Sequence, residues 1–105
     1  MKSAIIAIGI VLLAGYAAPE ARAADPGAGK QVARTTCVAC HGMGGIGITD
    51  QYPNLAGQKA PYLESQLKAF RDGTRNNPIM SPMAKQLSDN DIANLAAYYS
   101  QLEPK

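Results

Sequence analysis

The sequence has few of the residues that cross-link small proteins or bind metals, with two cysteines and one histidine in 105 residues. Cys37 and Cys40 are three positions apart, which is too close for a disulfide that would staple the fold. Tetrahedral zinc usually takes four Cys or His ligands, and His41 is the only histidine. A domain of this size buries a limited core and often needs a staple. Something other than a disulfide or a zinc ion is therefore expected to fill the core.

An excess of one charge is also missing. The formal net charge of the chain is +2, and loss of Lys2, Arg22 and Glu20 with the N-terminal segment leaves about +1. Domains that bind nucleic acid carry a clustered basic surface. Nothing in this charge balance points to one, so no nucleic-acid partner is predicted.

The longest apolar run lies near the N-terminus and is short for a membrane span. A basic start leads into the uncharged run 4–18, and Ala21-Arg22-Ala23 supplies small residues at the positions that a signal peptidase reads. The run of about 15 residues falls short of the about 20 that cross a bilayer, which argues against a retained anchor. We predict a signal peptide over residues 1–23, and a mature domain over residues 24–105 exported to the periplasm. No stable membrane insertion is expected after cleavage.

Three stretches of the mature chain follow helical rules. The first covers residues 27–40. The second begins with a proline at a first-turn position and ends at a glycine, residues 61–73. The third, residues 88–102, opens with a Ser and an Asp three positions later, close to a capping box, and continues as an apolar stripe of helical period. No strand alternation is present, so an all-α fold is predicted.

Two long irregular segments are predicted between these helices. Residues 42–59 hold five glycines and one proline, and residues 74–87 hold two prolines. Loops of this length are unusual in so small a domain. They can stay ordered if they wrap an apolar group that the chain itself does not make, and a haem is such a group.

Cys37-Val38-Ala39-Cys40-His41 is the central motif. Behind an export signal, two cysteines at this spacing can add to the two vinyl groups of one haem, and the following histidine then lies under the iron. The main alternative is a thiol–disulfide site of the thioredoxin kind. That reading requires a βαβ context, and no strand pattern precedes Cys37. The motif therefore favours one covalently attached haem c, with His41 as an axial iron ligand.

The second axial ligand is expected to be a methionine, which raises the reduction potential and closes the iron to other ligands. Met43 is too near His41 to reach the opposite face of the haem. Met80 and Met83 both precede the third helix. Either can serve, and the other then fills a gap in the core.

With these motifs together, the sequence resembles the class I bacterial c-type cytochromes, in particular the small cytochrome c-553 group and single domains of the diheme cytochrome c-four group. The resemblance covers residues 27–102 and rests on five stretches: 37–42, 52–58, 70–73, 80–83 and 87–99. It implies a small cytochrome c fold with three main helices and long loops wrapped around one covalently bound haem.

The resemblance also selects between the two methionines. In the family the ligand stands seven residues before the leucine of the Leu-Ser-Asp stretch, which is Leu87 here. That spacing implies Met80 as the axial ligand, with Met83 as the alternative.

Further roles follow from the same resemblance. The carbonyl of Pro53 is expected to accept a hydrogen bond from the outer ring nitrogen of His41, a contact that fixes ring orientation. Leu55 is expected to pack on the haem. Arg71 and Arg75 are candidates for pairing with the haem propionates, and both can equally be solvated surface residues.

An iron with both axial sites filled binds no substrate, so the predicted function is electron transfer rather than enzyme catalysis. Donor and acceptor oxidoreductases are the expected partners, and they should bind transiently through a small interface. Two alternatives remain. The chain can be the fixed cytochrome subunit of a periplasmic dehydrogenase, or a haem enzyme or sensor with an open sixth site that lacks the methionine ligand.

Overall fold

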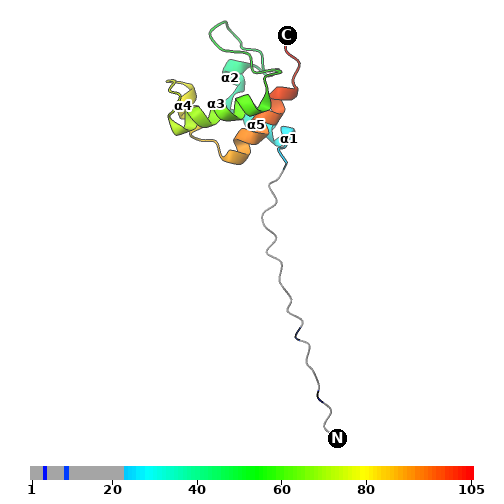
Figure 1. Cartoon of the computed structure of the whole chain (residues 1–105). Helices are drawn as coiled ribbons and strands as arrows, with labels where there is room; N and C mark the ends of the chain where they lie inside the picture. The colour runs from blue at the N-terminus through cyan, green and yellow to red at the C-terminus, as the bar shows by residue number, and fades with distance from the viewer. Residues whose placement is uncertain (1–3, 5–8, 10–22) are drawn as a thin grey trace.

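The computed structural model describes residues 4, 9 and 23–105. The predicted signal peptide, residues 1–23, therefore lies outside the described residues except at positions 4, 9 and 23. The described part contains helices and no strand, which confirms the all-α fold (Figure 1). Its helices are α1 (Pro26–Thr36), α2 (Val38–His41), α3 (Ala60–Asp72), α4 (Met80–Ala84) and α5 (Asp89–Gln101).

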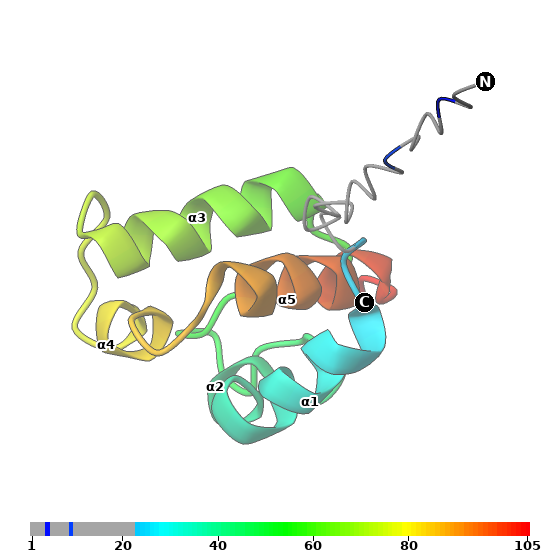
Figure 2. The same cartoon turned by 90° about the horizontal axis from the view of Figure 1, so that it is seen from below.

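Helix α5 is the central element. It lies between α3 on one side and α1 with α2 on the other (Figure 2). Ile92 and Leu95 of α5 are the large side chains that are almost completely buried. Helix α1 approaches α5 at Gly29, where an added Cβ atom would overlap the backbone carbonyl of Asn94. A glycine at this position therefore allows two helices distant in sequence to cross in close contact.

The ends of the long helices follow the local signals in the sequence. Ser88 accepts a hydrogen bond from the Asp91 amide at 3.0 Å, and the Asp91 carboxylate accepts one from the Ser88 amide at 3.1 Å. This reciprocal pair is the capping box predicted at the start of α5. At the end of α3, Gly73 has a φ of 85°, the left-handed conformation that glycine adopts without strain.

The prediction of one continuous helix over residues 27–40 is wrong. Helix α1 ends at Thr36, and the separate helix α2 begins at Val38. In the last turn of α1 the Thr35 hydroxyl donates to the Val32 carbonyl at 3.0 Å. Such side-chain bonds compete with the helical backbone pattern and disturb its geometry. The break at Cys37 separates the first cysteine from the helix that carries Cys40 and His41.

The second long loop, residues 74–87, contains a short helix that the sequence pattern did not reveal. The side chain of Asn77 accepts hydrogen bonds from the amides of Ile79 and Met80, both at 2.9 Å, just where α4 begins. These bonds satisfy amide groups that a helix start leaves unpaired. Helix α4 packs on α3 and carries both Met80 and Met83.

No helix among the described residues is both long and apolar enough to cross a membrane.

Candidate haem site

One cavity of about 380 Å³ lies between the end of α1, α2, the loop 51–58, α3, α4 and α5. Its size is in the range of about 300–1,000 Å³ that ligand pockets have. The structure brings the whole set of predicted site residues into its wall: Cys37, Cys40, His41, Pro53, Leu55, Met80 and Met83. Residues from three separate stretches of the chain, 37–41, 53–55 and 80–83, therefore face one space.

His41 is buried at one wall of the cavity, with 6% of its surface exposed. Its Nδ1 atom lies 2.8 Å from the carbonyl oxygen of Pro53. A carbonyl can only accept a hydrogen bond, so Nδ1 must carry the ring proton. In the neutral imidazole, Nε2 is then the nitrogen with a free lone pair, which is suited to binding a metal.

The loop that carries Pro53 is tied back to the segment after α2. The Gly45 carbonyl accepts hydrogen bonds from the amides of Leu55 at 2.7 Å and Ala56 at 3.0 Å. The Asn54 side chain accepts one from the Gly47 amide at 2.8 Å. These three hydrogen bonds, made by the residues directly after Pro53, hold the loop against the segment after α2.

Both candidate methionines reach the cavity from α4. Met80 and Met83 are half-buried and three positions apart, so they lie on neighbouring parts of one helix face. Geometry alone thus places the two sulfur-bearing side chains in the same wall.

The two cysteines are half-buried at the cavity. Burial raises the pKa of the Cys37 thiol, and a nearby Tyr99 hydroxyl lowers it by a smaller amount. Reactive thiols of disulfide-exchange enzymes have depressed pKa values. The environment of Cys37 therefore does not match that of a thioredoxin-like thiol.

The two arginines considered for the haem propionates are separated by the structure. Arg71 forms an ion pair with Asp89 at 2.7 Å and does not line the cavity. Arg75 does line the cavity. Its Nη1 donates to the Gln66 side chain at 2.6 Å, and its guanidinium lies 4.4 Å from the centre of the Phe70 ring. Of the two, Arg75 is the residue placed to meet a carboxylate at the cavity.

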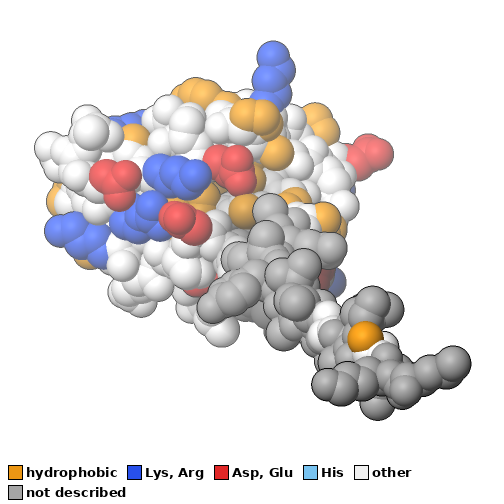
Figure 3. Space-filling model, turned by 60° about the horizontal axis from the view of Figure 1, so that its bottom comes forward, with side chains coloured by type: hydrophobic (Ala, Val, Ile, Leu, Met, Phe, Trp, Pro, Cys, Tyr) orange, Lys and Arg blue, Asp and Glu red, His pale blue; other side chains and the backbone are white. Residues whose placement is uncertain are grey.

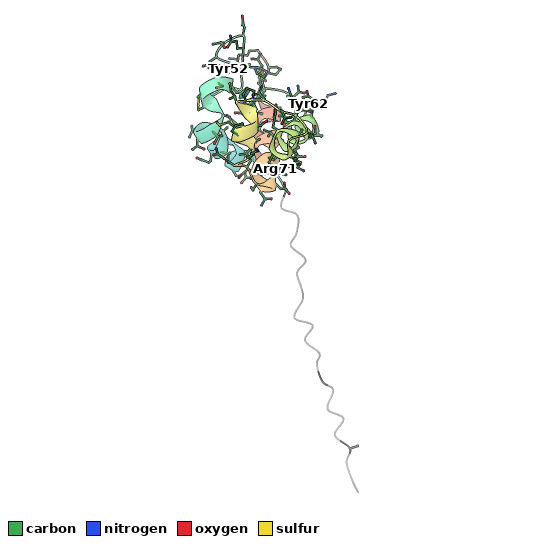
Figure 4. All side chains as sticks on the ribbon, turned by 90° about the vertical axis from the view of Figure 1, so that its left-hand side faces the viewer. Tyr52, Tyr62 and Arg71 are labelled. Atoms are coloured by element: carbon green, nitrogen blue, oxygen red, sulfur yellow. The ribbon has the colours of Figure 1, made fainter. Side chains whose placement is uncertain are left out.

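The rim of the cavity includes exposed apolar side chains. Tyr62 and Ile79 line the cavity and are 49% and 52% exposed. In Figure 4, Tyr52 and Tyr62, both wall residues, lie in the upper part of the folded domain, and Arg71 lies below them. Charges of both signs lie side by side on the face shown in Figure 3, without a large patch of one sign.

Several wall residues were not predicted from the sequence as site residues. They are mostly apolar side chains of α3 and α5: Leu63, Leu67, Phe70, Leu95, Ala96 and Tyr99. Their helical period was visible in the sequence. That period does not distinguish a face that packs on protein from a face that packs on a cofactor.

The sequence profile described as "Cytochrome c" matches residues 27–103. This chain belongs to the cytochrome c family. As a cytochrome c it is an electron-transfer protein and carries covalently bound haem c, for which Cys37, Cys40 and His41 have the attachment spacing. The cavity fits this group, since it joins apolar walls to that motif at one edge.

Three known proteins illustrate the relationship. The cytochrome is 61% identical to cytochrome c-554(548) of Halomonas halodenitrificans, over 65% of this chain and 86% of the relative. It is 48% identical to a thiosulfate dehydrogenase electron acceptor of Thiomonas intermedia, over 85% of this chain and 39% of that one. The solved cytochrome c4 of Acidithiobacillus ferrooxidans superposes with a TM-score of 0.70 at 33% identity, over 80% of this chain and 53% of that one. This cytochrome thus spans most of the first protein but about half or less of the other two.

Proposed function

We propose that residues 24–105 form a periplasmic monohaem cytochrome that carries single electrons between redox proteins, with His41 and Met80 as axial iron ligands. One observation carries this proposal: His41 and Met80 lie in the wall of a single cavity that also holds both cysteines. The bound haem supplies a one-electron iron couple. The chain supplies its attachment, its ligands and its shield from water.

His41 is suited to bind iron through Nε2, because its Nδ1 proton is held by the Pro53 carbonyl at 2.8 Å. This contact sets the tautomer and the orientation of the ring before a metal binds. Burial of the ring limits its movement. A ligand held in this way stays in place in both oxidation states, so little reorganisation accompanies electron transfer.

Both methionines line the cavity, so their position there does not distinguish them. The family spacing from Leu87 favours Met80 over Met83. The hydrogen bond from the Met80 amide to the Asn77 side chain, at 2.9 Å, fixes Met80 at the start of α4. A thioether ligand raises the reduction potential. Met83 then fills space beside it as a flexible apolar side chain.

Cys37 and Cys40 attach the haem covalently, and Leu55 packs against it. Tyr62 and Ile79 give the exposed rim of the cavity an apolar character, which suits brief docking of a donor or an acceptor. Weak redox encounters use small interfaces of this kind, below about 1,200 Å². Export is supported by the signal-peptide pattern of residues 1–23, and the mature chain needs no membrane insertion.

A second candidate function is a fixed cytochrome subunit of a periplasmic dehydrogenase. The match to a thiosulfate dehydrogenase electron acceptor favours it, although that protein is more than twice as long as the matched segment. Purification from the native source separates the two functions. A free shuttle elutes alone at the size of one small domain, and a fixed subunit elutes with an oxidoreductase after mild extraction.

The ligand assignment is tested by absorption spectroscopy of the oxidised protein. His/Met coordination gives a weak far-red band from the iron–methionine bond. Its absence in the wild-type protein would reject the His/Met carrier and favour an open-site enzyme or sensor. Mass spectrometry of the exported protein tests the domain boundaries, and a mature chain that begins at Ala24 is expected.

A further inference from the structure

Tyr99 is a buried residue of α5 whose hydroxyl has no hydrogen-bond partner among the described residues. Only 3% of its surface is exposed, and the residue lines the cavity. Buried hydroxyl groups are nearly always hydrogen-bonded, and each exception needs an explanation. An unpaired hydroxyl in a cofactor cavity suggests that the hydroxyl gains a hydrogen-bond partner when the cofactor is attached.

Cys37 is the polar neighbour that fits this hydroxyl. Its side chain packs against the core cluster that contains Tyr99, and both residues line the same cavity. The two groups also affect each other's titration. Burial is the main cause that raises the pKa of Tyr99, and Cys37 raises it further. In turn, the Tyr99 hydroxyl lowers the pKa of Cys37, against the larger effect of burial. The two side chains thus lie in one packed cluster at the cavity wall, and no hydrogen bond between them is formed among the described residues.

The neighbouring tyrosine has a different environment. The Tyr98 hydroxyl donates to the Met43 carbonyl at 3.1 Å, and Tyr98 does not line the cavity. The two rings lie 5.0 Å apart, centre to centre. Two consecutive tyrosines of one helix thus differ: among the described residues, the Tyr98 hydroxyl has a hydrogen-bond partner and the Tyr99 hydroxyl has none.

We infer that in the haem-bearing protein the Tyr99 hydroxyl donates a hydrogen bond to the sulfur of Cys37 and so acts as a positioning residue for the haem. The inference rests on the proposed attachment of haem at Cys37. A free thiol can donate or accept, but the thioether left after attachment has no proton and can only accept. Tyr99 must then be the donor, which satisfies its buried hydroxyl.

The hydrogen bond has an electronic consequence. A donor at the thioether withdraws electron density from the sulfur, and through it from the macrocycle to which the sulfur is bonded. Hydrogen bonds near a haem are among the means by which a protein sets its potential. Donation by Tyr99 stabilises the reduced state, so the reduction potential is higher with the hydroxyl than without it.

The main test compares Tyr99→Phe with Tyr98→Phe in the purified haem-bearing protein. Both changes remove one hydroxyl from α5 and keep the ring. We expect Tyr99→Phe to lower the equilibrium constant for reduction about two- to fivefold, as for loss of one weak hydrogen bond. Tyr98→Phe should leave it unchanged, because its partner is a carbonyl outside the cavity. Equal potentials for Tyr99→Phe and the wild type would overturn the inference.

Resonance Raman spectroscopy gives a second readout, which reports on the hydrogen bond at the sulfur itself. In wild-type protein moved from H₂O to D₂O, the C–S stretching band of one thioether should shift, and Tyr99→Phe should abolish the shift. A band insensitive to D₂O in the wild type would contradict the inference. The far-red iron–methionine band is recorded on the same samples. If the far-red band is present and the potentials of wild type and Tyr99→Phe are equal, only the role of Tyr99 is rejected. If the band is absent from the wild type, the proposed His/Met ligation is rejected.

Discussion

The Nδ1 atom of His41 lies 2.8 Å from the carbonyl oxygen of Pro53, twelve residues further along the chain. The contact involves a backbone oxygen, so it depends on the path of the loop rather than on the proline side chain. The hydrogen bonds to Gly45 and Asn54 hold that path. The histidine is thus oriented by a loop that hydrogen bonds hold against the segment after α2.

Replacing Met80 with alanine should remove the far-red absorption band of the oxidised protein. The change deletes the sulfur that we propose as the sixth iron ligand, and loss of a thioether ligand also lowers the reduction potential. Met83→Ala is the matched control on the same helix, and it should keep the band. A band that survives in Met80→Ala and disappears in Met83→Ala would assign the ligand to Met83.

Replacing Arg75 with glutamine should lower the reduction potential. A cation at the cavity favours the iron state with less positive charge, so its loss favours oxidation. Because Arg75 is exposed, a two- to fivefold fall in the equilibrium constant for reduction is expected, equivalent to about 0.5–1 kcal/mol. Arg71→Gln serves as the control, since Arg71 does not line the cavity. Equal shifts of the reduction potential in the two variants, measured by potentiometric titration, would show that the effect does not depend on whether the arginine lines the cavity.

The ion pair of Arg71 with Asp89 should make stability depend on pH. The hydrogen bond from Arg71, and then its charge, lower the pKa of the Asp89 carboxyl in the folded state. Its stabilisation is therefore present above the ordinary pKa of aspartate and is lost as the pH falls through the folded-state pKa. Both side chains contact solvent, so the effect should be small and should shrink with added salt.

Guanidinium unfolding between neutral and acid pH measures this dependence. Arg71→Gln should lose less stability on acidification than the wild type, because it lacks the pair that acid breaks. Arg34→Gln is a suitable control, as Arg34 has no ion pair among the described residues. Identical slopes for wild type and Arg71→Gln would mean that the pair contributes nothing measurable.

Replacing Gly29 with alanine should destabilise the fold. The added Cβ would overlap the Asn94 carbonyl where α1 crosses α5, and relief requires the helices to move apart. Overpacking of this kind costs about 1–3 kcal/mol. Gly44→Ala is the matched control, because a Cβ there meets nothing within 4 Å. Thermal unfolding followed by circular dichroism should show a lower midpoint for Gly29→Ala only; equal midpoints would refute the close crossing.

The sequence alone determined the features that depend on a few adjacent residues. The Cys37-x-x-Cys40-His41 spacing indicated covalent haem, and Ser88 with Asp91 predicted the capping box at the start of α5. Hydrogen bonds and covalent chemistry within about one helical turn are encoded locally. For the same reason the three long helices could be placed with good accuracy at most of their ends.

Only the tertiary structure decided which of two similar residues faces the cavity. Arg71 and Arg75 are four positions apart, yet one pairs with Asp89 and the other lines the cavity. Tyr98 and Tyr99 are adjacent, yet within the part of the chain that the structure describes only the Tyr98 hydroxyl is hydrogen-bonded. These choices depend on how α3, the segment that follows it and α5 pack against elements far away in the sequence. Helical period gives the presence of a buried face, but the packing of distant elements determines what each side chain on that face meets.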